Sequence, residues 1–320
     1  MYILVYFIYI NIVFHSLFKT FGLKSLNKLY FLKGEYLMSD LFVLIGFDIE
    51  HDAEPFSKSC EGVKKGLPKI LDILNQLEIN CTFNILGSII DDNFDLFKQI
   101  QKSGHELGCH SYDHEALSFM SEEDIYLQVE KSTSDIYKKL GEKPVTFRAP
   151  YLLGNTYLIN TLNKFHYLLD SSYPLAHYKK QILPYNPSDK DWTKKGNLNI
   201  LELPVSADPN IKEPGKSDIW PIWRTIGTED TKQKIENLIK IQNKYKKENV
   251  ITFYLHPWEF IELEKIGLDI PEDHQEKILA GTGKKAISNF KEILVWLKKQ
   301  KNATFLTMKD FRKIWEKEAE

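Results

Sequence analysis

The sequence is poor in cysteine and carries almost no net charge. Three cysteines occur among 320 residues, at Cys60, Cys81 and Cys109, and none of them forms a C-x-x-C pair. An odd number without such spacing argues against a disulfide framework and favours a reducing, cytoplasmic compartment. The net charge is −2, from 42 basic and 44 acidic residues, and the basic residues are scattered along the chain. Because they form no stripe, we do not expect nucleic acid as a partner.

The chain has one long apolar run, at its start, and this run lacks the marks of a signal peptide. Residues 1–18, MYILVYFIYINIVFHSLF, are almost wholly apolar, without a basic n-region or a small-residue cleavage site. The run is barely long enough to span a bilayer, and the lysines after it would keep the rest of the chain on the cytoplasmic side of the membrane. Alternatively, the working protein starts at Met38, and residues 1–37 are an extension. Either interpretation leaves 38–320 as the one domain that carries the function.

From Met38 onward, apolar runs with strand character alternate with amphipathic segments of helical period. We expect strands at 41–48, 79–86, 105–111, 145–150, 166–170, 198–206, 249–256 and 303–306, and helices at 67–77, 92–104, 121–141, 155–165, 228–248 and 284–300. Such alternation without an internal repeat predicts a parallel α/β sheet, either wound open or closed as a barrel. Residues 171–227 hold three tryptophans, several prolines and little helical period. A stretch this long is more than a connection, so we expect an insertion or lid over one mouth of the fold.

Polar residues stand where five of these strands end. The motifs are FDIEHD, CHSYDH, FRAPY, LDSSYP and YLHPWE. In parallel α/β folds the chemistry takes place at the carboxyl ends of the strands. Each coincidence alone is weak, but five together predict one shared site.

The first strand end supplies two carboxylates that face the same way. Asp48 and Glu50 are two positions apart, so in an extended strand both side chains point to one side. Close carboxylates raise each other's pKa unless a cation lies between them, which suggests one metal ligand and one base. Asp52 has the same parity and is the alternative to Glu50, although we expect the strand to have ended by then. His51 has the opposite parity and is interpreted as structural.

The third strand end supplies two histidines with metal-ligand spacing. His110 and His114 are four positions apart, and a helical turn or a tight loop brings such a pair onto one face, which suits a zinc-type ion. Two histidines and one carboxylate leave coordination positions open for water, as a hydrolytic metal requires. His105 stands at the start of the strand and Cys109 inside it, and both are interpreted as structural.

Two later strand ends supply an arginine and a histidine. Arg148 can pair with a carboxylate and fix its orientation. His256 ends the most apolar strand of the chain, and Pro257 stops that strand, which places the histidine well for a general acid. Asp170 could raise the pKa of His256 by pairing with it, and Glu259 is the alternative partner.

Taken in this order, the elements FDIE, HSYDH, RAPY, DSSYP and LHP resemble the polysaccharide deacetylases of carbohydrate esterase family 4, which share the NodB-homology domain. The resemblance runs from about residue 41 to about residue 310. It implies a distorted (β/α) barrel of about seven units. It also implies removal of acetyl groups from sugars with one divalent metal ion, for which zinc is expected, with cobalt, nickel or manganese as alternatives.

The resemblance further implies a role for each matching residue. The general base would be Asp48, the metal ligands His110 and His114, the residue that orients the base Arg148, the oxyanion donor the backbone N–H of Tyr151, and the general acid His256. In the usual pattern two aspartates are adjacent, whereas here Ile49 intervenes and Glu50 takes the ligand position. This departure resembles a subgroup that includes exopolysaccharide-associated deacetylases, where H-P-W-E also occurs, and relatives that act on other C–N bonds. The third ligand and the substrate therefore stay open.

Three functions are compatible with these residues. The first is a metal-dependent hydrolase of non-peptide C–N bonds that removes an acetyl group from an N-acetylated sugar in a glycan, a glycolipid or a sugar precursor. The second is a hydrolase of a small non-sugar amide or ureide. The third is a non-catalytic barrel that binds glycan, but a binding module has no chemical need for both Asp48 and His256. The sequence leaves the oligomeric state open.

Overall fold

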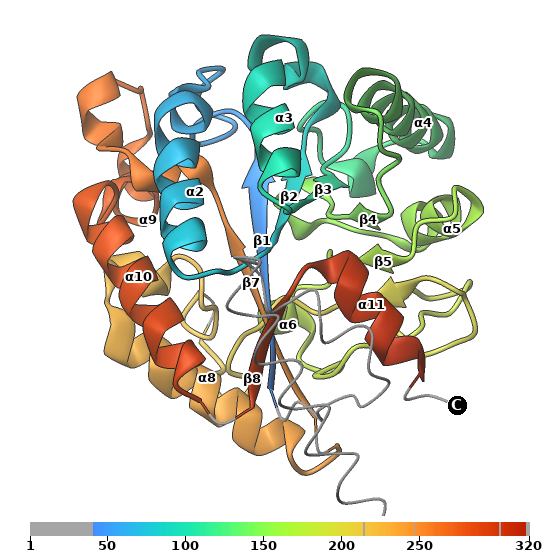
Figure 1. Cartoon of the computed structure of the whole chain (residues 1–320). Helices are drawn as coiled ribbons and strands as arrows, with labels where there is room; N and C mark the ends of the chain where they lie inside the picture. The colour runs from blue at the N-terminus through green and yellow to red at the C-terminus, as the bar shows by residue number, and fades with distance from the viewer. Residues whose placement is uncertain (1–40, 214, 247, 301, 318–320) are drawn as a thin grey trace, which may run out of the picture. The chain divides into compact units, whose positions relative to one another are not determined.

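All strands of the computed structural model are parallel and belong to one sheet. The structure describes residues 41–213, 215–246, 248–300 and 302–317, so the predicted anchor at 1–18 and the extension at 1–37 lie outside the described residues. The strands are β1 (Leu41–Ile49), β2 (Thr82–Ile85), β3 (Glu106–Cys109), β4 (Thr146–Phe147), β5 (Leu169–Asp170), β6 (Leu201–Glu202), β7 (Asn249–Leu255) and β8 (Ala303–Leu306). Their order is β6-β5-β4-β3-β2-β1-β7, and β8 pairs with β1 (Figure 1).

Strand β1 is the centre of the sheet because its sequence, LFVLIGFDI, is buried along its whole length. One edge pairs with β7 from Leu41 to Phe47. The other edge pairs first with β8, from Leu41 to Leu44, and then with β2, from Gly46 to Ile49. The carboxyl half of β1 therefore leads directly into the site between β2 and β7.

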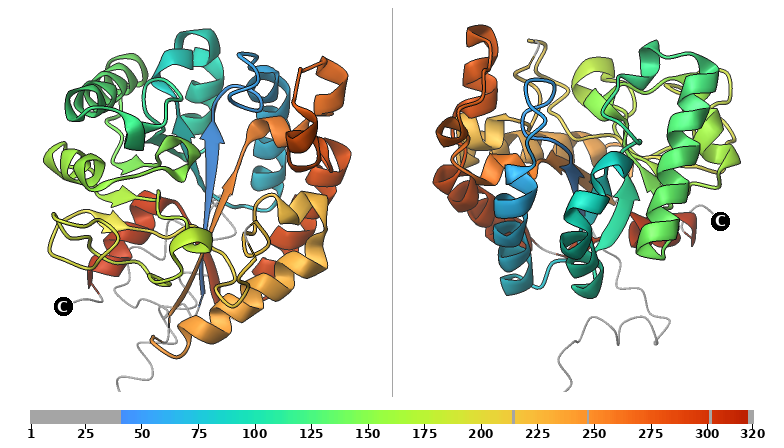
Figure 2. Two further views of the ribbon diagram at one scale, coloured as in Figure 1. Left: turned by 180° about the vertical axis from the view of Figure 1, so that it is seen from behind. Right: turned by 90° about the horizontal axis from the view of Figure 1, so that it is seen from above.

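The sheet curls without a complete ladder between its two ends. The chain that follows β6 reaches β7, where the N–H of Ser206 donates to the carbonyl of Thr252 over 3.1 Å. The N–H of Thr252 in turn donates to Ser206 Oγ over 2.8 Å. These two bonds join β7 to the far end of the sheet and produce an irregular barrel (Figure 2).

Helices cover the outside of the curled sheet (Figure 2). The helices of the described residues are α2 (Leu67–Gln76), α3 (Phe94–Lys102), α4 (Glu122–Leu140), α5 (Thr156–Lys164), α6 (Leu175–Tyr178), α7 (Ile222–Thr225), α8 (Thr228–Gln242), α9 (Glu272–Leu279), α10 (Lys284–Lys298) and α11 (Met308–Lys317). Of these, α11 packs on the face of β1 that is turned away from the large core. Helix α4 is capped at both ends, because Ser121 Oγ accepts a hydrogen bond from the N–H of Asp124 and Gly141 ends the helix with a φ of 82°. Among the described residues, no helix has the length and apolarity needed to cross a membrane.

The two faces of β1 have different surroundings, as the two-residue period of a strand requires. Val43, Ile45 and Phe47 belong to the large core beneath the helices. On the opposite face, Phe42 and Leu44 join a smaller core with residues of α11. Further along that same face, the side chains become small and then acidic, at Gly46, Asp48 and Glu50. The sequence of one strand face thus defines an apolar end and a polar end of the barrel.

The segment 171–227, predicted as an insertion or lid, includes β6 and so contributes to the sheet. Its three tryptophans, Trp192, Trp220 and Trp223, are buried. Trp192 packs edge-on against Tyr173, and Trp223 packs against Phe260. Much of the segment is therefore part of the barrel wall, and a lid function for the rest remains a prediction.

Candidate active site

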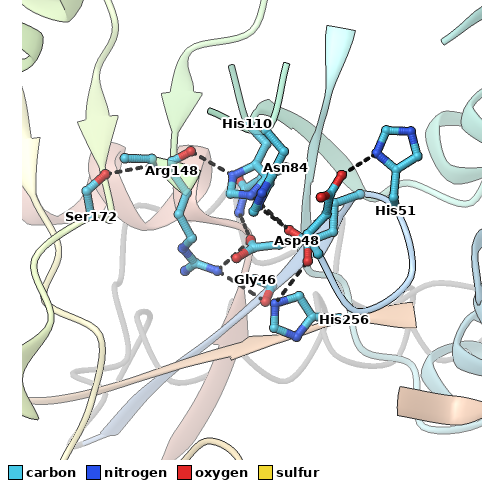
Figure 3. A network of polar contacts seen from close by, with 12 residues as sticks. Gly46, Asp48, His51, Asn84, His110, Arg148, Ser172 and His256 are labelled. Carbon is cyan, nitrogen blue, oxygen red and sulfur yellow. Dashed lines mark hydrogen bonds and ion pairs between the residues drawn. The ribbon is translucent and has the colours of Figure 1, made fainter. Parts of the chain in front are cut away.

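The predicted strand-end residues meet at the carboxyl ends of four strands. Asp48 is the last residue but one of β1, and His110 follows β3 directly. Arg148 follows β4, and His256 follows β7 (Figure 3). All four side chains are almost fully buried. Parallel pairing brings these ends together at one edge of the barrel, although up to 208 positions separate Asp48 from His256 in the sequence.

Three side chains form a group that could hold a metal ion. One ligand atom from each of Glu50, His110 and His114 lies within 4.8 Å of the other two. Glu50 Oε2 is 3.2 Å from His110 Nε2 and 2.8 Å from His114 Nε2. His110 Nδ1 lies 2.8 Å from the carbonyl oxygen of Arg148, to which it donates, so its Nε2 keeps a lone pair for a cation.

The charges in this group favour an ionised carboxylate. Burial alone would raise the pKa of Glu50, but the neighbouring His114 and His256 and a hydrogen bond with His110 lower it well below its usual value. Burial likewise lowers the pKa of His114, and Glu50 outweighs this and raises it. His114 Nδ1 is buried and has no hydrogen-bond partner among the described residues. A carboxylate facing two imidazoles is a donor set that suits a zinc-type cation.

Asp48 lies beside this group with one oxygen fixed. Its Oδ1 accepts hydrogen bonds from Arg148 Nη1 and from Asn84 Nδ2, both over 2.9 Å (Figure 3). No described residue donates to its Oδ2 in the same way. One carboxylate oxygen is therefore held while the other is available to take a proton.

Arg148 is held in the barrel by acceptors on three sides. Its Nε donates to the carbonyl of Ser171 over 3.0 Å, and its Nη2 donates to Ser171 Oγ over 3.0 Å. Its Nη1 also reaches the carbonyl of Gly46. A Cβ at Gly46 would lie 2.6 Å from Nη1, so only glycine leaves room for the guanidinium at this point of β1.

Tyr151 covers the histidine side of the site. Its ring packs edge-on against His114, with centroids 4.4 Å apart, and the side chain is 44% exposed. Its backbone is left-handed, with a φ of 57°, which turns the chain sharply after β4. Burial and the acidic neighbours Glu54 and Glu50 raise the pKa of Tyr151 to about 12. Among the described residues, its backbone N–H has no acceptor.

His256 lies on the other side of Glu50 and is held by Glu259. Its Nε2 is 3.7 Å from Glu50 Oε1, and its Nδ1 is 3.0 Å from Glu259 Oε1. Burial alone would lower the pKa of His256, but Glu50, Glu259 and Asp48 outweigh it and raise it. The ring stacks on Trp258 with centroids 4.9 Å apart.

Asp170 was expected to pair with His256, and the structure corrects this expectation. Asp170 accepts a hydrogen bond from Ser172 Oγ over 2.6 Å and lies in register with Glu202 on the next strand. Burial and the adjacent carboxyl of Asp170 raise the pKa of Glu202. Asp170 is thus engaged by Ser172 and lies near Arg148, and Glu259 is the partner of His256.

The alternative third ligand, Asp52, points away from the histidines. It accepts hydrogen bonds from Ser59 Oγ and from the backbone N–H groups of Glu61 and Gly62. These bonds hold the loop after β1. Since the strand ends at Ile49, the alternation of side chains between its two faces no longer applies at Asp52. The geometry therefore groups Glu50, and not Asp52, with His110 and His114.

The residues interpreted as structural bind partners outside the group of Glu50, His110 and His114. His51 is 2.7 Å from Glu54. His105 accepts a hydrogen bond from the N–H of Cys81, and Cys109 Sγ donates to Ser132 Oγ.

Sequence reasoning missed several polar neighbours of the site. Asn84 was placed inside a predicted strand without a role, although an amide in a buried strand is a signal of a polar interior. The roles of Ser171, Trp220 and Arg224 depend on contacts between distant segments, and no local pattern marks them.

The first comparison with known proteins concerns the family. Residues 45–169 match the polysaccharide deacetylase family. This range contains the motifs around Asp48, His110, His114 and Arg148, whereas His256 lies beyond it.

Two similar proteins and one similar solved structure are also named as deacetylases. The chain is 36% identical over 84 residues to the peptidoglycan-N-acetylglucosamine deacetylase PgdA of Listeria monocytogenes, which covers 26% of this chain and only 18% of that protein. It is 26% identical over 181 residues to a peptidoglycan-N-acetylglucosamine deacetylase of Bacillus cereus, covering 57% of this chain and 76% of that protein. The fold matches a Mycobacterium smegmatis protein whose name assigns it as a polysaccharide deacetylase, with a TM-score of 0.65 and 17% identity, over 89% of this chain and 93% of that one.

The structural match confirms the predicted distorted (β/α) barrel. The order of the motifs and the fold agree with this match. Within residues 45–169, the chain is similar to the polysaccharide deacetylase family.

Proposed function

We propose that this protein is a metal-dependent hydrolase that removes an acetyl group from an N-acetylated sugar. The observation that carries the proposal is the group of Glu50, His110 and His114, with Asp48 on one side and His256 on the other. This arrangement places a possible cation site between a base and an acid at one buried edge of the barrel. A glycan-binding module would not need this combination.

The donor set fits a divalent ion, and zinc is the ion we propose. Two imidazole nitrogens and one carboxylate are the ligands of a catalytic zinc site, with coordination positions left for water and substrate. The carbonyl of Arg148 fixes the tautomer of His110, as a residue behind a metal ligand commonly does. A bound ion would supply an activated water and would polarise the acetamide carbonyl.

The residues around the group suit the proton transfers of amide hydrolysis. Asp48 Oδ2 would take the proton of the attacking water, while Arg148 and Asn84 hold Oδ1. The backbone N–H of Tyr151 would donate to the developing oxyanion. His256 Nε2 would protonate the amine that leaves, because Nδ1 is engaged by Glu259.

The substrate class rests on the named relatives. The Listeria and Bacillus cereus proteins are named as peptidoglycan-N-acetylglucosamine deacetylases, and a further relative is named as a chitin deacetylase of Cryptococcus neoformans. We therefore propose a polymer or precursor that contains N-acetylglucosamine. The Asp-x-Glu arrangement of Asp48 and Glu50, together with H-P-W-E, favours an exopolysaccharide within this class.

Acetate release by the full chain tests the proposal. The panel would contain N-acetylglucosamine, penta-N-acetylchitopentaose and a partly acetylated exopolysaccharide, with bound metal measured in parallel. Hydrolysis of the ureide allantoin, which releases no acetate, would be followed separately as formation of allantoate. Asp48→Asn and His114→Ala should each lower kcat by at least about 100-fold, since a positioned base contributes about 10²–10⁴-fold. Asp72→Asn and His177→Ala are matched controls on exposed positions and should keep full activity. Hydrolysis of allantoin alone, or equal activity in all variants, would refute the proposed function.

We also propose that the protein acts in the cytoplasm, with membrane association through residues 1–18 as the alternative. Fractionation of cells expressing chains that begin at Met1 or at Met38 distinguishes the two. Equal recovery of both chains in the soluble fraction would exclude the membrane association.

A further inference from the structure

The residue that orients His256 comes from the same turn of the chain. Pro257–Phe260 form a single 3-10 turn after β7, and this turn places the side chain of Glu259 back over His256. Glu259 Oε1 accepts the backbone N–H of His256 over 2.9 Å and lies 3.0 Å from its Nδ1. The motif H-P-W-E thus carries both the imidazole and the carboxylate that binds it.

Glu259 is itself fixed by the segment that precedes α8. Arg224 Nε donates to Glu259 Oε2, and Trp220 Nε1 donates to Oε1 over 3.0 Å. Arg224 and Glu259 are both fully buried. Arg224 also donates to the carbonyls of Lys277 and Ala280, at the end of α9. The segment before α8 therefore binds both oxygens of the carboxylate, and the end of α9 holds Arg224 in turn.

Aromatic packing by itself does not define which nitrogen of His256 faces the site. The ring stacks on Trp258 at an interplanar angle of 19° and packs edge-on against Trp220 with ring centroids 5.5 Å apart. A 180° turn of the imidazole about its Cβ–Cγ bond keeps almost the same shape, so these contacts accept both orientations. Only a hydrogen-bond acceptor on one side distinguishes Nδ1 from the ring carbon.

We propose that Glu259 is the positioning residue of the catalytic acid and that Arg224 and Trp220 hold it in place. Glu259 accepts the Nδ1 proton, which leaves Nε2 on the side of Glu50 and of the departing amine. This inference rests on the proposed function, in which His256 is the acid. It assigns to the segment 171–227 a share in catalysis, because Trp220 and Arg224 both belong to it.

The test compares Glu259→Asp in two backgrounds. Aspartate keeps the negative charge that the buried Arg224 requires, so the variant should fold, but it withdraws the carboxylate by one methylene from Nδ1. On penta-N-acetylchitopentaose we expect kcat to fall about 10- to 100-fold, less than the loss of the acid itself. KM, bound metal and Tm should stay close to the wild-type values. In a His256→Ala background, the same change should cause no further loss, because the residue it positions is gone.

A matched control and a second readout keep the inference falsifiable. Glu262→Asp, three positions further on at a partly exposed site, should leave kcat unchanged. An equal loss from Glu259→Asp in both backgrounds would show a structural role and overturn the inference, as would no loss in either.

If the wild type releases no acetate from any sugar of the panel, the proposed function fails. Histidine ¹H–¹⁵N NMR then decides the positioning role independently. It should show a downfield Nδ1–H signal that is absent in His256→Ala and shifted in Glu259→Asp. A signal that Glu259→Asp does not change would refute the contact.

Discussion

Replacing Arg148 with lysine tests how much of the site depends on one buried guanidinium. Four hydrogen bonds are at stake: two to Ser171, one to Asp48 and one to the carbonyl of Gly46. A lysine has one nitrogen and no planar fork, so it can keep one or two of these bonds. Two or three lost bonds at about 1 kcal/mol each lower the free energy of unfolding by about 2–3 kcal/mol. For a chain of this size each kcal/mol lowers Tm by about 2–4 °C.

The activity should fall further than the stability explains. Without the guanidinium, Asp48 keeps only Asn84 as a donor to its Oδ1. The carboxylate can then rotate, and Oδ2 spends less time in the orientation that takes a proton from the attacking water. We expect kcat for acetate release from penta-N-acetylchitopentaose to fall about 10- to 100-fold while KM changes little, because orientation errors affect the transition state most.

Arg312→Lys is the matched control for this substitution. Arg312 is also nearly buried and donates to two carbonyls, those of Leu168 and Asn199, but it lies on α11. This control should lose stability to a similar degree and keep its kcat. Thermal unfolding and initial rates, measured on both variants at equal folded concentration, separate the two effects. Equal rates for the two variants would refute the view that Arg148 orients the base.

Three further predictions follow from single residues. Glu50→Gln should abolish binding of one equivalent of zinc, measured by equilibrium dialysis, whereas Asp52→Asn should keep the metal and lower Tm, and the reverse pattern would assign the third ligand to Asp52. Gly46→Ala should cost about 1–3 kcal/mol of stability and much of the activity, because its Cβ would meet the guanidinium of Arg148 at 2.6 Å; unchanged urea unfolding would contradict this. Burial lowers the pKa of His105 to about 4 in the folded state, while the unfolded chain binds a proton near pH 6.5, so stability is lost as the pH falls between these values. His105→Gln should remove about 2 kcal/mol of the pH 7 to pH 5 difference in unfolding free energy, and an identical pH dependence in both proteins would disprove it.

The sequence predicted the regular elements well where periodicity was long. All eight expected strands occur, and β8 at 303–306 has the expected bounds. Six of them are shorter than predicted, and β4, β5 and β6 have only two residues each. A run of apolar residues indicates a buried segment. The hydrogen-bonded pairing that defines a strand is shorter than this segment, because neighbouring strands diverge where the sheet curls. Helices α9 and α11 were not predicted, because short elements without clear caps have little local signal.

The residues of the candidate site could be predicted from the sequence, but the contacts between them could not. The residue types and their order along the chain were readable because strand parity and strand ends are local properties, and they led to Asp48, Glu50, His110 and His114. Contacts between segments were not readable. Glu259, and not Asp170, contacts His256 because the 3-10 turn after β7 brings Glu259 to the imidazole, whereas Asp170 is bound by Ser172.

By itself, the sequence determined the parallel α/β architecture, the family motifs and the set of candidate chemical groups, because these follow from residue type and short-range spacing. Only the tertiary structure decided which of those groups act together. It grouped Glu50 with the two histidines and turned Asp52 into the loop after β1. It placed Glu259 beside His256 and bound it to a buried arginine from a distant segment. Such choices depend on distances between parts of the chain far apart in sequence, and those distances exist only after the barrel has closed.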